Sequence, residues 1–376
     1  MDDYIGKGIP KLGFGLMRPP MIDSKIDIEQ LKQMVDMFMD RGFSYFDTAW
    51  GYLNGRSEEV AKEVLVNRYP RDSFQLATKM PAWAAPTAQA AKKMIYTSLE
   101  RTGLDYFDFY LLHNLGGSGN DRTETFNRFG IWDFLAEKKQ EGLIRHLGFS
   151  FHAKADHLDE VLSEHPEMDF VQLQINYADW DNEIIQSRKC YEVARKHGKP
   201  VIVMEPVKGG ALANLPGPVA DILKQANPRV SQASWAIRYA ASLGGIVTVL
   251  SGMSNIEQME DNLAVMEHFA PLGSDERQTI KKVQAVLAQF PQVPCTDCQY
   301  CIKGCPQNIP ISGIFRAVND YLIYNDAKRA GSTYMFETMD AGKASDCIAC
   351  GQCESACPQS IEIIEELGKA RELLEA

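Results

Sequence analysis

The chain lacks a long hydrophobic run. Although 45% of its 376 residues are hydrophobic, no apolar segment approaches the roughly 20 residues that a membrane-spanning helix needs. The first residues, Met1–Tyr4, carry no basic region followed by an apolar core, so we expect no secretory signal. From these absences we expect a soluble, cytoplasmic protein that does not associate with membranes.

Positive charge is also scarce. The chain carries 39 Lys and Arg against 50 Asp and Glu, for a formal net charge of −11, and the basic residues form no stripe. A protein that binds nucleic acid or an anionic membrane surface usually presents a basic patch. We therefore expect neither partner and look for small molecules and proteins instead.

Cysteine is almost missing from most of the chain. Of nine cysteines, only Cys190 precedes residue 295; it lies in an expected helix and is interpreted as a small buried hydrophobe. The other eight form two identical runs near the C-terminus. Where no secretory signal is expected, such spacing indicates metal ligation rather than disulfides. A domain boundary is therefore predicted near Pro291–Pro294.

The cysteine-poor body alternates short β-rich segments with amphipathic helical patterns. Eight strands and eight helices over about 270 residues are typical of a (β/α)8 TIM barrel, which we assign to residues 1–273. A doubly wound open sheet is the alternative, but the G-x-G-x-x-G turn expected after its first strand is absent. The predicted strands are Gly13–Met17, Ser44–Asp47, Gln75–Thr78, Phe109–Leu112, Leu147–Ser150, Val171–Gln174, Val201–Met204 and Val247–Leu250.

Polar residues stand where three neighbouring strands end, which is where barrel enzymes carry their active sites. Asp47, Lys79 and His113 follow the second, third and fourth strands, and Tyr52 lies in the loop after Asp47. Taken singly, the first three read as a turn cap, a solvated charge and a core histidine. Their convergence with Tyr52 at one rim favours a catalytic interpretation.

These four side chains suit the protonation of a carbonyl oxygen while a hydride reaches its carbon. A free tyrosine has a pKa near 10, and a neighbouring ammonium such as Lys79 favours the phenolate and lowers that pKa. Asp47 can hold the ammonium by an ion pair. His113 can donate a hydrogen bond to the substrate oxygen.

The body resembles the aldo-keto reductase family over roughly residues 8–270. The resemblance is carried by Asp-Thr-Ala-x-x-Tyr at 47–52, Thr-Lys at 78–79, Leu-Leu-His at 111–113, Gly-Phe-Ser at 148–150, Val-Gln at 171–172 and Ser-Asn-Ile-Glu-Gln at 254–258 with Asp261-Asn262. It implies that NADPH or NADH binds across the strand ends, with Tyr52 as proton donor. By the same resemblance, Ser150 and Gln172 would hold the nicotinamide amide, and Ser254, Gln258, Asp261 and Asn262 the adenosine end.

The sequence departs from this family in its expected cofactor contacts. Phe151 stands where the family often has asparagine, and Gly252 and Gln258 stand where many members place the Lys and Arg that bind a 2′-phosphate. Lys208 is an alternative phosphate contact. The choice between NADPH and NADH therefore stays open. Four aromatic residues in rim loops either line a substrate pocket or pack within the loops: Trp50, Trp83, Tyr177 and Trp180. Arg18 either meets an acidic group of the substrate or is a solvated charge at the rim.

The C-terminal runs are Cys295-x2-Cys298-x2-Cys301-x3-Cys305-Pro and Cys347-x2-Cys350-x2-Cys353-x3-Cys357-Pro. This spacing is typical of two [4Fe–4S] clusters in which the last cysteine of each run binds the other cluster. Zinc would need only two pairs of cysteines. We predict one cluster on Cys295, Cys298, Cys301 and Cys357 and the other on Cys347, Cys350, Cys353 and Cys305.

Helical spacing between the two runs makes residues 291–376 resemble the α-helical kind of two-cluster ferredoxin domain, with a linking helix at 274–290. From Pro291 onward the chain has 12 acidic and 7 basic residues, which suits either a basic redox protein as partner or simply a soluble surface.

Two functional hypotheses follow. The first is a nicotinamide-dependent oxidoreductase that reduces an aldehyde or ketone to an alcohol, or catalyses the reverse, with an attached electron-transfer lobe. The second is a nicotinamide-binding redox sensor or adaptor whose clusters are structural or sense oxygen. Hydride transfer moves two electrons and a cluster moves one, and no flavin motif that would mediate between them occurs in the sequence.

Overall fold

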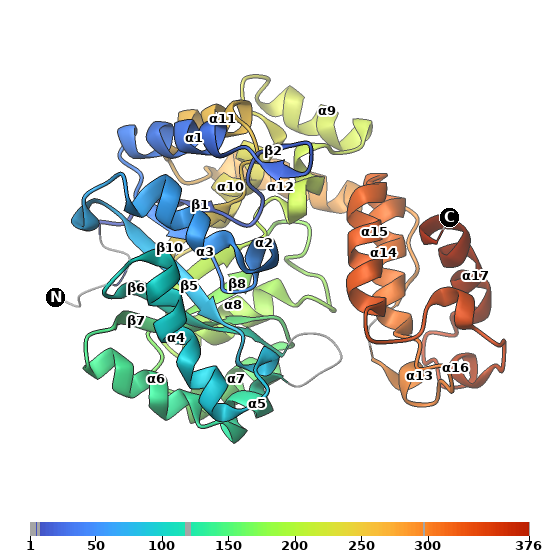
Figure 1. The fold of residues 1–376 in the computed structure, drawn as a ribbon. Coiled ribbons are helices and arrows are strands. Elements are labelled where there is room, and N and C mark those ends of the chain that lie inside the picture. The colour runs from blue at the N-terminus through green and yellow to red at the C-terminus, as the bar shows by residue number, and fades with distance from the viewer. Residues whose placement is uncertain (1–4, 6–7, 117–121, 296–297, 376) are drawn as a thin grey trace. The chain divides into compact units, whose positions relative to one another are not determined.

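The computed structural model describes residues 5, 8–116, 122–295 and 298–375, which form two compact units (Figure 1). The first unit comprises Met1–Asp181, Ile185–Val207 and Ala233–Leu272. The second comprises Asn182–Ile184, Lys208–Gln232 and Gly273–Ala376. The second unit thus joins the C-terminal residues from Gly273 onward to two segments from within the body of the chain.

The first unit is a closed barrel of parallel strands in the order β1-β10-β9-β8-β7-β6-β5-β4. The predicted (β/α)8 barrel is therefore confirmed, and each predicted strand is present. Their bounds are β1 (Leu12–Gly15), β4 (Tyr45–Asp47), β5 (Gln75–Met80), β6 (Phe107–Leu115), β7 (Ile144–Phe151), β8 (Phe170–Gln174), β9 (Val201–Met204) and β10 (Ile246–Ser251). A short hairpin that was not predicted, β2 (Met21–Ile22) with β3 (Lys25–Ile26), follows β1.

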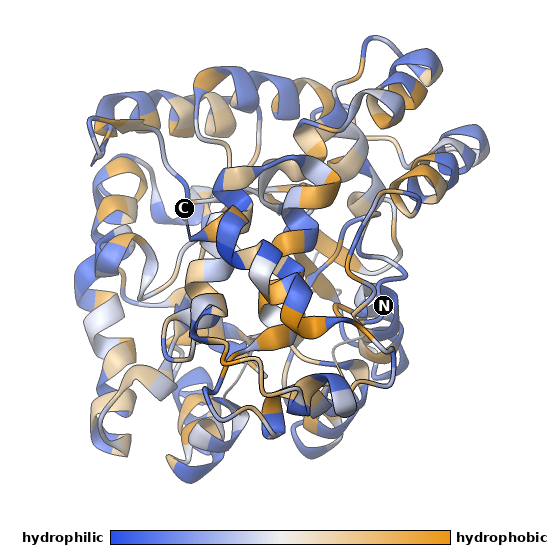
Figure 2. Ribbon diagram, turned by 90° about the vertical axis from the view of Figure 1, so that its right-hand side faces the viewer, coloured by the Kyte–Doolittle hydropathy of each residue, from blue (hydrophilic) through white to orange (hydrophobic). Residues whose placement is uncertain are grey.

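Amphipathic helices surround the strands (Figure 1), and Figure 2 shows hydrophobic and hydrophilic residues alternating along them. α1 illustrates the pattern: Asp27 caps its first turn by accepting from the Gln30 N–H, and Leu31, Val35 and Phe38 are buried. The helices are α1 (Ile28–Asp40), α2 (Tyr52–Gly55), α3 (Ser57–Ala61), α4 (Ala88–Thr102), α5 (Arg122–Arg128), α6 (Ile131–Gln140), α7 (Ala155–Glu164), α8 (Ser187–Lys196), α10 (Gln232–Ala241) and α11 (Ile256–Met266).

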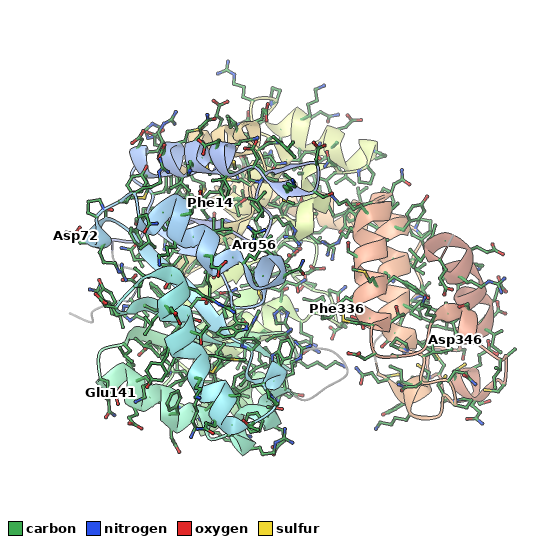
Figure 3. The ribbon with its side chains drawn as sticks, viewed as in Figure 1. Phe14, Arg56, Asp72, Glu141, Phe336 and Asp346 are labelled. Atoms are coloured by element: carbon green, nitrogen blue, oxygen red, sulfur yellow. The ribbon has the colours of Figure 1, made fainter. Side chains whose placement is uncertain are left out.

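The barrel has an inner and an outer layer of packed side chains. Inside the barrel, Tyr45, Phe109 and Phe170 belong to one cluster of buried apolar side chains. Between strands and helices, Phe14, marked in Figure 3, packs its ring 5.7 Å from that of Phe38, which lies on α1. The polar strand ends stand above this apolar filling. In the described part of the chain, no helix combines the length and apolar character needed to cross a membrane.

The second unit is mainly helical, as predicted. α14 packs against α15 and α17, and α12 packs against α9. Ile314, Phe315 and Leu367 lie in its core together with the cysteines Cys301 and Cys353. Its helices are α9 (Gly217–Ala226), α12 (Ser274–Leu287), α13 (Tyr300–Lys303), α14 (Ile311–Tyr324), α15 (Ala327–Thr338), α16 (Gln352–Ser355) and α17 (Ile363–Leu374).

The segment 208–232 lies between β9 and α10 in the chain but belongs to the second unit. At its start, the backbone carbonyl of Lys208 accepts a hydrogen bond from Arg329 on α15. Arg329 also donates to Asp320 of α14, over 3.1 Å. The Lys208 ammonium lies 3.9 Å from another oxygen of Asp320. An ionic group of three residues, two of them well buried, therefore ties this segment to α14 and α15.

Candidate active site and cysteine cavities

Asp47, Lys79 and Tyr52 meet at the C-terminal end of β4 and β5. The Lys79 ammonium lies 2.5 Å from Asp47 Oδ1 and donates to the Thr48 carbonyl over 2.8 Å. The same nitrogen is 4.9 Å from the centre of the ring of Tyr52, the first residue of α2. The side chains of Lys79 and Asp47 are only 1% and 5% exposed. The structure therefore brings together the acid, the base and the phenol that were predicted to converge.

The electrostatics of this group differ in part from the expectation. Burial raises the pKa of the Tyr52 phenol, and the Lys79 ammonium acts against that rise. Burial would lower the pKa of Lys79, but Asp47 and Tyr52 outweigh it and raise the pKa. Lys79 is therefore held charged beside Tyr52. It lowers the pKa of the phenol as expected, but by less than burial raises it.

His113 is a second neighbour of Tyr52. The two ring centres are 5.8 Å apart and the rings are nearly perpendicular. Burial, followed by the nearby charge of Lys79, holds the pKa of His113 well below its usual value, so the imidazole is neutral. Its Nδ1 is buried and has no hydrogen-bond partner among the described residues. A neutral imidazole here can still donate one hydrogen bond to a ligand.

Trp83 fixes the backbone at His113. Its indole N–H donates to the His113 carbonyl over 3.0 Å, and the Arg122 guanidinium lies 3.8 Å from the centre of its ring. Among the aromatic rim residues named from the sequence, Trp83 thus forms a hydrogen bond with the backbone of one catalytic candidate, His113. Trp180 instead packs on Tyr191 and Tyr239 in edge-on or tilted contacts.

Ser150 and Gln172 lie opposite each other in β7 and β8. Ser150 Oγ accepts a hydrogen bond from the Asn114 N–H over 2.8 Å. The side-chain oxygens of Gln172 and Asn114 are both buried without a partner in the described part of the chain. Asn114 was missed from the sequence. The sequence offered one signal for it: an asparagine, which tolerates left-handed backbone better than most residues, directly follows the candidate catalytic residue His113.

The residues expected at the adenosine end gather where β10 leads into α11. Ser254 Oγ donates to the Arg18 carbonyl over 2.9 Å, and the Ser254 N–H donates to Gln258 Oε1 over 2.8 Å. Deeper in, Asn262 donates to Ser251 Oγ over 2.7 Å. Asp261 accepts from Ser234 of α10. Ser254 and Gln258 therefore form the exposed end of this group, whereas Asn262 is buried.

Two further basic residues named from the sequence have partners in the protein. The Lys208 ammonium approaches Asp320 and lies over the Tyr324 ring, 5.8 Å from its centre. Arg18, just past β1, pairs with Glu205 over 3.5 Å. Lys208 is therefore engaged with α14, and Arg18 stays at the rim beside the catalytic candidates.

The eight C-terminal cysteines surround two cavities. One is lined by Cys295, Cys298, Cys301 and Cys357. The other is lined by Cys347, Cys350, Cys353 and Cys305. Each cavity therefore holds three cysteines of one run and the last cysteine of the other, which is the grouping that the spacing predicts.

The apolar walls of the cavities also suit a cluster. Ile311 at the start of α14 lines both, Phe315 and Ile363 line the first, and Ile309 and Leu367 line the second. No group of three or more His, Cys, Asp or Glu side chains in the described ranges is arranged to hold a single metal ion. A four-iron cluster places each thiolate on a different iron, so its cysteines ring a wider space. The donor set and the space both fit [4Fe–4S] clusters.

The chain is similar to an aldo-keto reductase of Mycolicibacterium vanbaalenii, with 27% identity over 69% of this chain and 83% of the relative. It is also 27% identical to L-galactose dehydrogenase of Arabidopsis thaliana, over 65% of this chain and 80% of that protein. An uncharacterized oxidoreductase of Bacillus subtilis, YqkF, is 26% identical over 66% of this chain.

Solved structures share the barrel. The holo form of an aldo-keto reductase from Bacillus halodurans aligns with a TM-score of 0.56 and 25% identity, over 73% of this chain and 92% of that one. An aldo-keto reductase from Klebsiella pneumoniae, solved in complex with NADPH, aligns with a TM-score of 0.57 at 22% identity, over 73% of this chain and 91% of that one; this likeness concerns the fold.

Family comparison divides the chain at the same place as the cysteine distribution. Residues 294–362 match the 4Fe-4S dicluster domain. Residues 11–285 match the aldo/keto reductase family, and that match covers the whole barrel. With its closed parallel barrel and an iron–sulfur domain at its C-terminus, the chain belongs to the aldo/keto reductase family of NAD(P)-dependent oxidoreductases.

Proposed function

We propose that this protein reduces the carbonyl of an aldehyde or ketone to an alcohol, or oxidises the alcohol, with NADPH or NADH as the hydride carrier and Tyr52 as the acid or base. One observation carries the proposal: the buried Lys79 ammonium lies between the Asp47 carboxylate and the Tyr52 ring. A charged lysine buried at that point stabilises the phenolate that remains when Tyr52 gives up its proton.

In the proposed reaction, a bound nicotinamide supplies the hydride for the carbonyl carbon. Tyr52 gives its proton to the carbonyl oxygen, and Lys79 favours the phenolate that is left. His113, neutral because burial lowers its pKa, donates a hydrogen bond that orients that oxygen. Asp47 keeps Lys79 charged through the 2.5 Å ion pair. The side chains of Lys79 and Asp47 are almost fully buried, so water is kept away from the ion pair that supports the proton transfer.

The residues proposed to hold the cofactor lie on the same rim. Ser150 and Gln172 would bind the nicotinamide amide. Ser254, Gln258, Asp261 and Asn262 would bind the adenosine end. Buried oxygens without protein partners support the nicotinamide end of this proposal, because such atoms usually pair with a ligand or with water.

We further propose that the C-terminal lobe carries two [4Fe–4S] clusters, on the two sets of four cysteines that line its cavities. The clusters would supply single-electron transfer, and the acidic lobe would meet a redox protein with a basic surface. Hydride transfer to the carbonyl carbon moves electrons in pairs, so this partner would serve the clusters rather than the carbonyl.

The test is an anaerobic survey of aldehyde and ketone substrates with NADPH and NADH, using protein purified without oxygen. We expect oxidation of at least one nicotinamide, coupled to alcohol formation. Binding of a nicotinamide with no turnover on any carbonyl or alcohol would instead favour the sensor or adaptor hypothesis. In the same samples, EPR before and after turnover reports whether the clusters change oxidation state.

A further inference from the structure

The pairing of β6 with β7 is irregular beside the candidate active site. The strands are in register at Leu112 with Phe149, and again at Leu115 with Phe151. Between these points β6 has two residues, His113 and Asn114, whereas β7 has only Ser150. This is a β-bulge, a feature that re-aims a side chain and often occurs next to active sites.

The bulge gives Asn114 an unusual backbone. Its φ is +61°, in the left-handed region, which costs most side chains energy but which asparagine tolerates. In this conformation its N–H donates to Ser150 Oγ over 2.8 Å. Because that oxygen already accepts a bond, the hydroxyl of Ser150 has its own hydrogen left to donate.

Three hydrogen-bonding groups on the neighbouring strands β6, β7 and β8 therefore have hydrogen-bonding capacity left for a ligand. Asn114 Oδ1 and Gln172 Oε1 are buried acceptors, and the Ser150 hydroxyl is a donor that lies between them in the strand order β6-β7-β8. A buried acceptor left unpaired is costly. The group has the polarity to bind a ligand with two N–H donors and one carbonyl acceptor.

We propose that Asn114 is a third residue that binds the nicotinamide carboxamide. This inference rests on the proposed nicotinamide site. The carboxamide has two N–H donors and one carbonyl oxygen, which complement the oxygens of Asn114 and Gln172 and the hydroxyl of Ser150. Phe151 cannot contribute, because its ring packs on Phe149 and His157. The bulge in β6 thus supplies the amide contact that β7 lacks at this position.

Asn114 also links cofactor and substrate positioning. It directly follows His113, whose carbonyl accepts from Trp83. Its own N–H is bonded to Ser150. A ligand bond to its side chain would therefore stabilise the bulge that carries the imidazole. Asn114 acts here as a positioning residue, so its test needs a measurement of binding as well as of rate.

The experiment compares two ligands that differ only at the carboxamide. NADP+ carries the amide nitrogen, and its 3-acetylpyridine analogue replaces that nitrogen with a methyl group. Dissociation constants are measured for both by tryptophan fluorescence, on the full-length anaerobic protein and its Asn114→Gly variant. Glycine keeps the left-handed backbone and removes only the side chain.

We expect the wild-type protein to bind NADP+ more tightly than the analogue. Asn114→Gly should raise the dissociation constant of NADP+ by roughly tenfold, the effect of one lost hydrogen bond to a buried group. It should leave the dissociation constant of the analogue nearly unchanged. Asn114→Asp, which keeps an acceptor oxygen, should preserve the preference for NADP+ and covers the case in which the glycine variant is unstable. Asn325→Gly makes the same change at an exposed left-handed position in the second unit and should alter neither constant.

The outcomes separate this inference from the function on which it rests. Equal weakening of both ligands by Asn114→Gly, or of neither, would overturn the role of Asn114. Loss of the preference for NADP+ in Asn114→Asp would overturn it as well. If the wild-type protein bound none of NADP+, NADPH, NAD+ and NADH, the proposed nicotinamide site itself would be wrong.

Discussion

The Lys79 ammonium and the Asp47 carboxylate form an ion pair 2.5 Å long that is almost completely hidden from solvent. Replacing Lys79 with methionine leaves Asp47 charged and buried, or forces it to take up a proton. We expect Lys79→Met to lower the free energy of unfolding by about 3–5 kcal/mol. All five tryptophans lie in the barrel unit, so denaturant unfolding followed by tryptophan fluorescence measures this effect there.

The double variant Lys79→Met/Asp47→Asn is the matched control. It removes both charges, so it should be more stable than Lys79→Met alone. A double variant that is destabilised by the sum of its single changes would contradict a coupled ion pair.

The second prediction concerns Tyr52. Tyr52→Phe removes only the hydroxyl that is proposed to give its proton to the substrate. Carbonyl reduction should fall by at least about a hundredfold, since general acid catalysis contributes about 10²–10⁴-fold. The dissociation constant for NADPH, measured by tryptophan fluorescence, should stay within about twofold of the wild-type value, because the Tyr52 hydroxyl is not among the proposed cofactor contacts. Turnover that survives in Tyr52→Phe would refute the proposed acid.

The third prediction concerns pH. Because burial holds the pKa of folded His113 well below 6.5, the unfolded chain binds a proton between the two pKa values and the folded chain does not. Stability should therefore fall as the pH drops below about 6.5, by at most about 1.4 kcal/mol per pH unit for this residue.

His113→Gln should lose less stability than the wild type over the same acid range, measured as unfolding midpoints from about pH 7 to pH 5. Burial also lowers the pKa of His146, but that residue is present in both proteins, so its contribution cancels in the comparison. Identical pH profiles for the two proteins would show that His113 keeps an ordinary pKa.

The fourth prediction tests which cysteines share a cluster. Anaerobically purified protein should contain about eight iron atoms per chain. Cys298→Ser/Cys357→Ser changes two ligands of one proposed cluster and should keep about four iron atoms. Cys298→Ser/Cys305→Ser changes one ligand of each and should keep far fewer, because both clusters lose a thiolate.

Iron analysis and EPR of the reduced proteins distinguish these variants. Cys190→Ser is the control, because Cys190 is buried in the barrel on α8, and it should keep all eight iron atoms. If the first double variant instead lost both clusters and the second lost only one, each cluster would be held by a single cysteine run.

Much of the barrel could be predicted because its strands are apolar on both faces and its helices on one. Val201–Met204 was predicted with the bounds that β9 has, since four consecutive apolar residues leave little choice. The helix α15 was missed. It exposes Met335 and Phe336, of which Phe336 is labelled in Figure 3, so its apolar residues do not mark one buried face.

At the active site, the sequence indicated which side chains converge but not how burial balances charge. Asp47, Lys79 and His113 follow from the rule that barrel strands end at one rim. The net rise in the pKa of Tyr52 could not be predicted, because it depends on how completely the phenol is enclosed. Asn114 was missed for a similar reason. A bulge is a mismatch between two strands, and neither strand alone reveals it.

The discontinuity of the second unit has a consequence for how the protein is made. The segment 208–232 leaves the ribosome before α10, β10 and α11, but its packing partners α12, α14 and α15 are synthesised after them. The barrel can therefore close before α12, which packs against α9, has been synthesised. A nascent chain that stops near residue 273 would lack this packing partner, so translation of the C-terminal helices also completes the part of the chain that begins at Lys208.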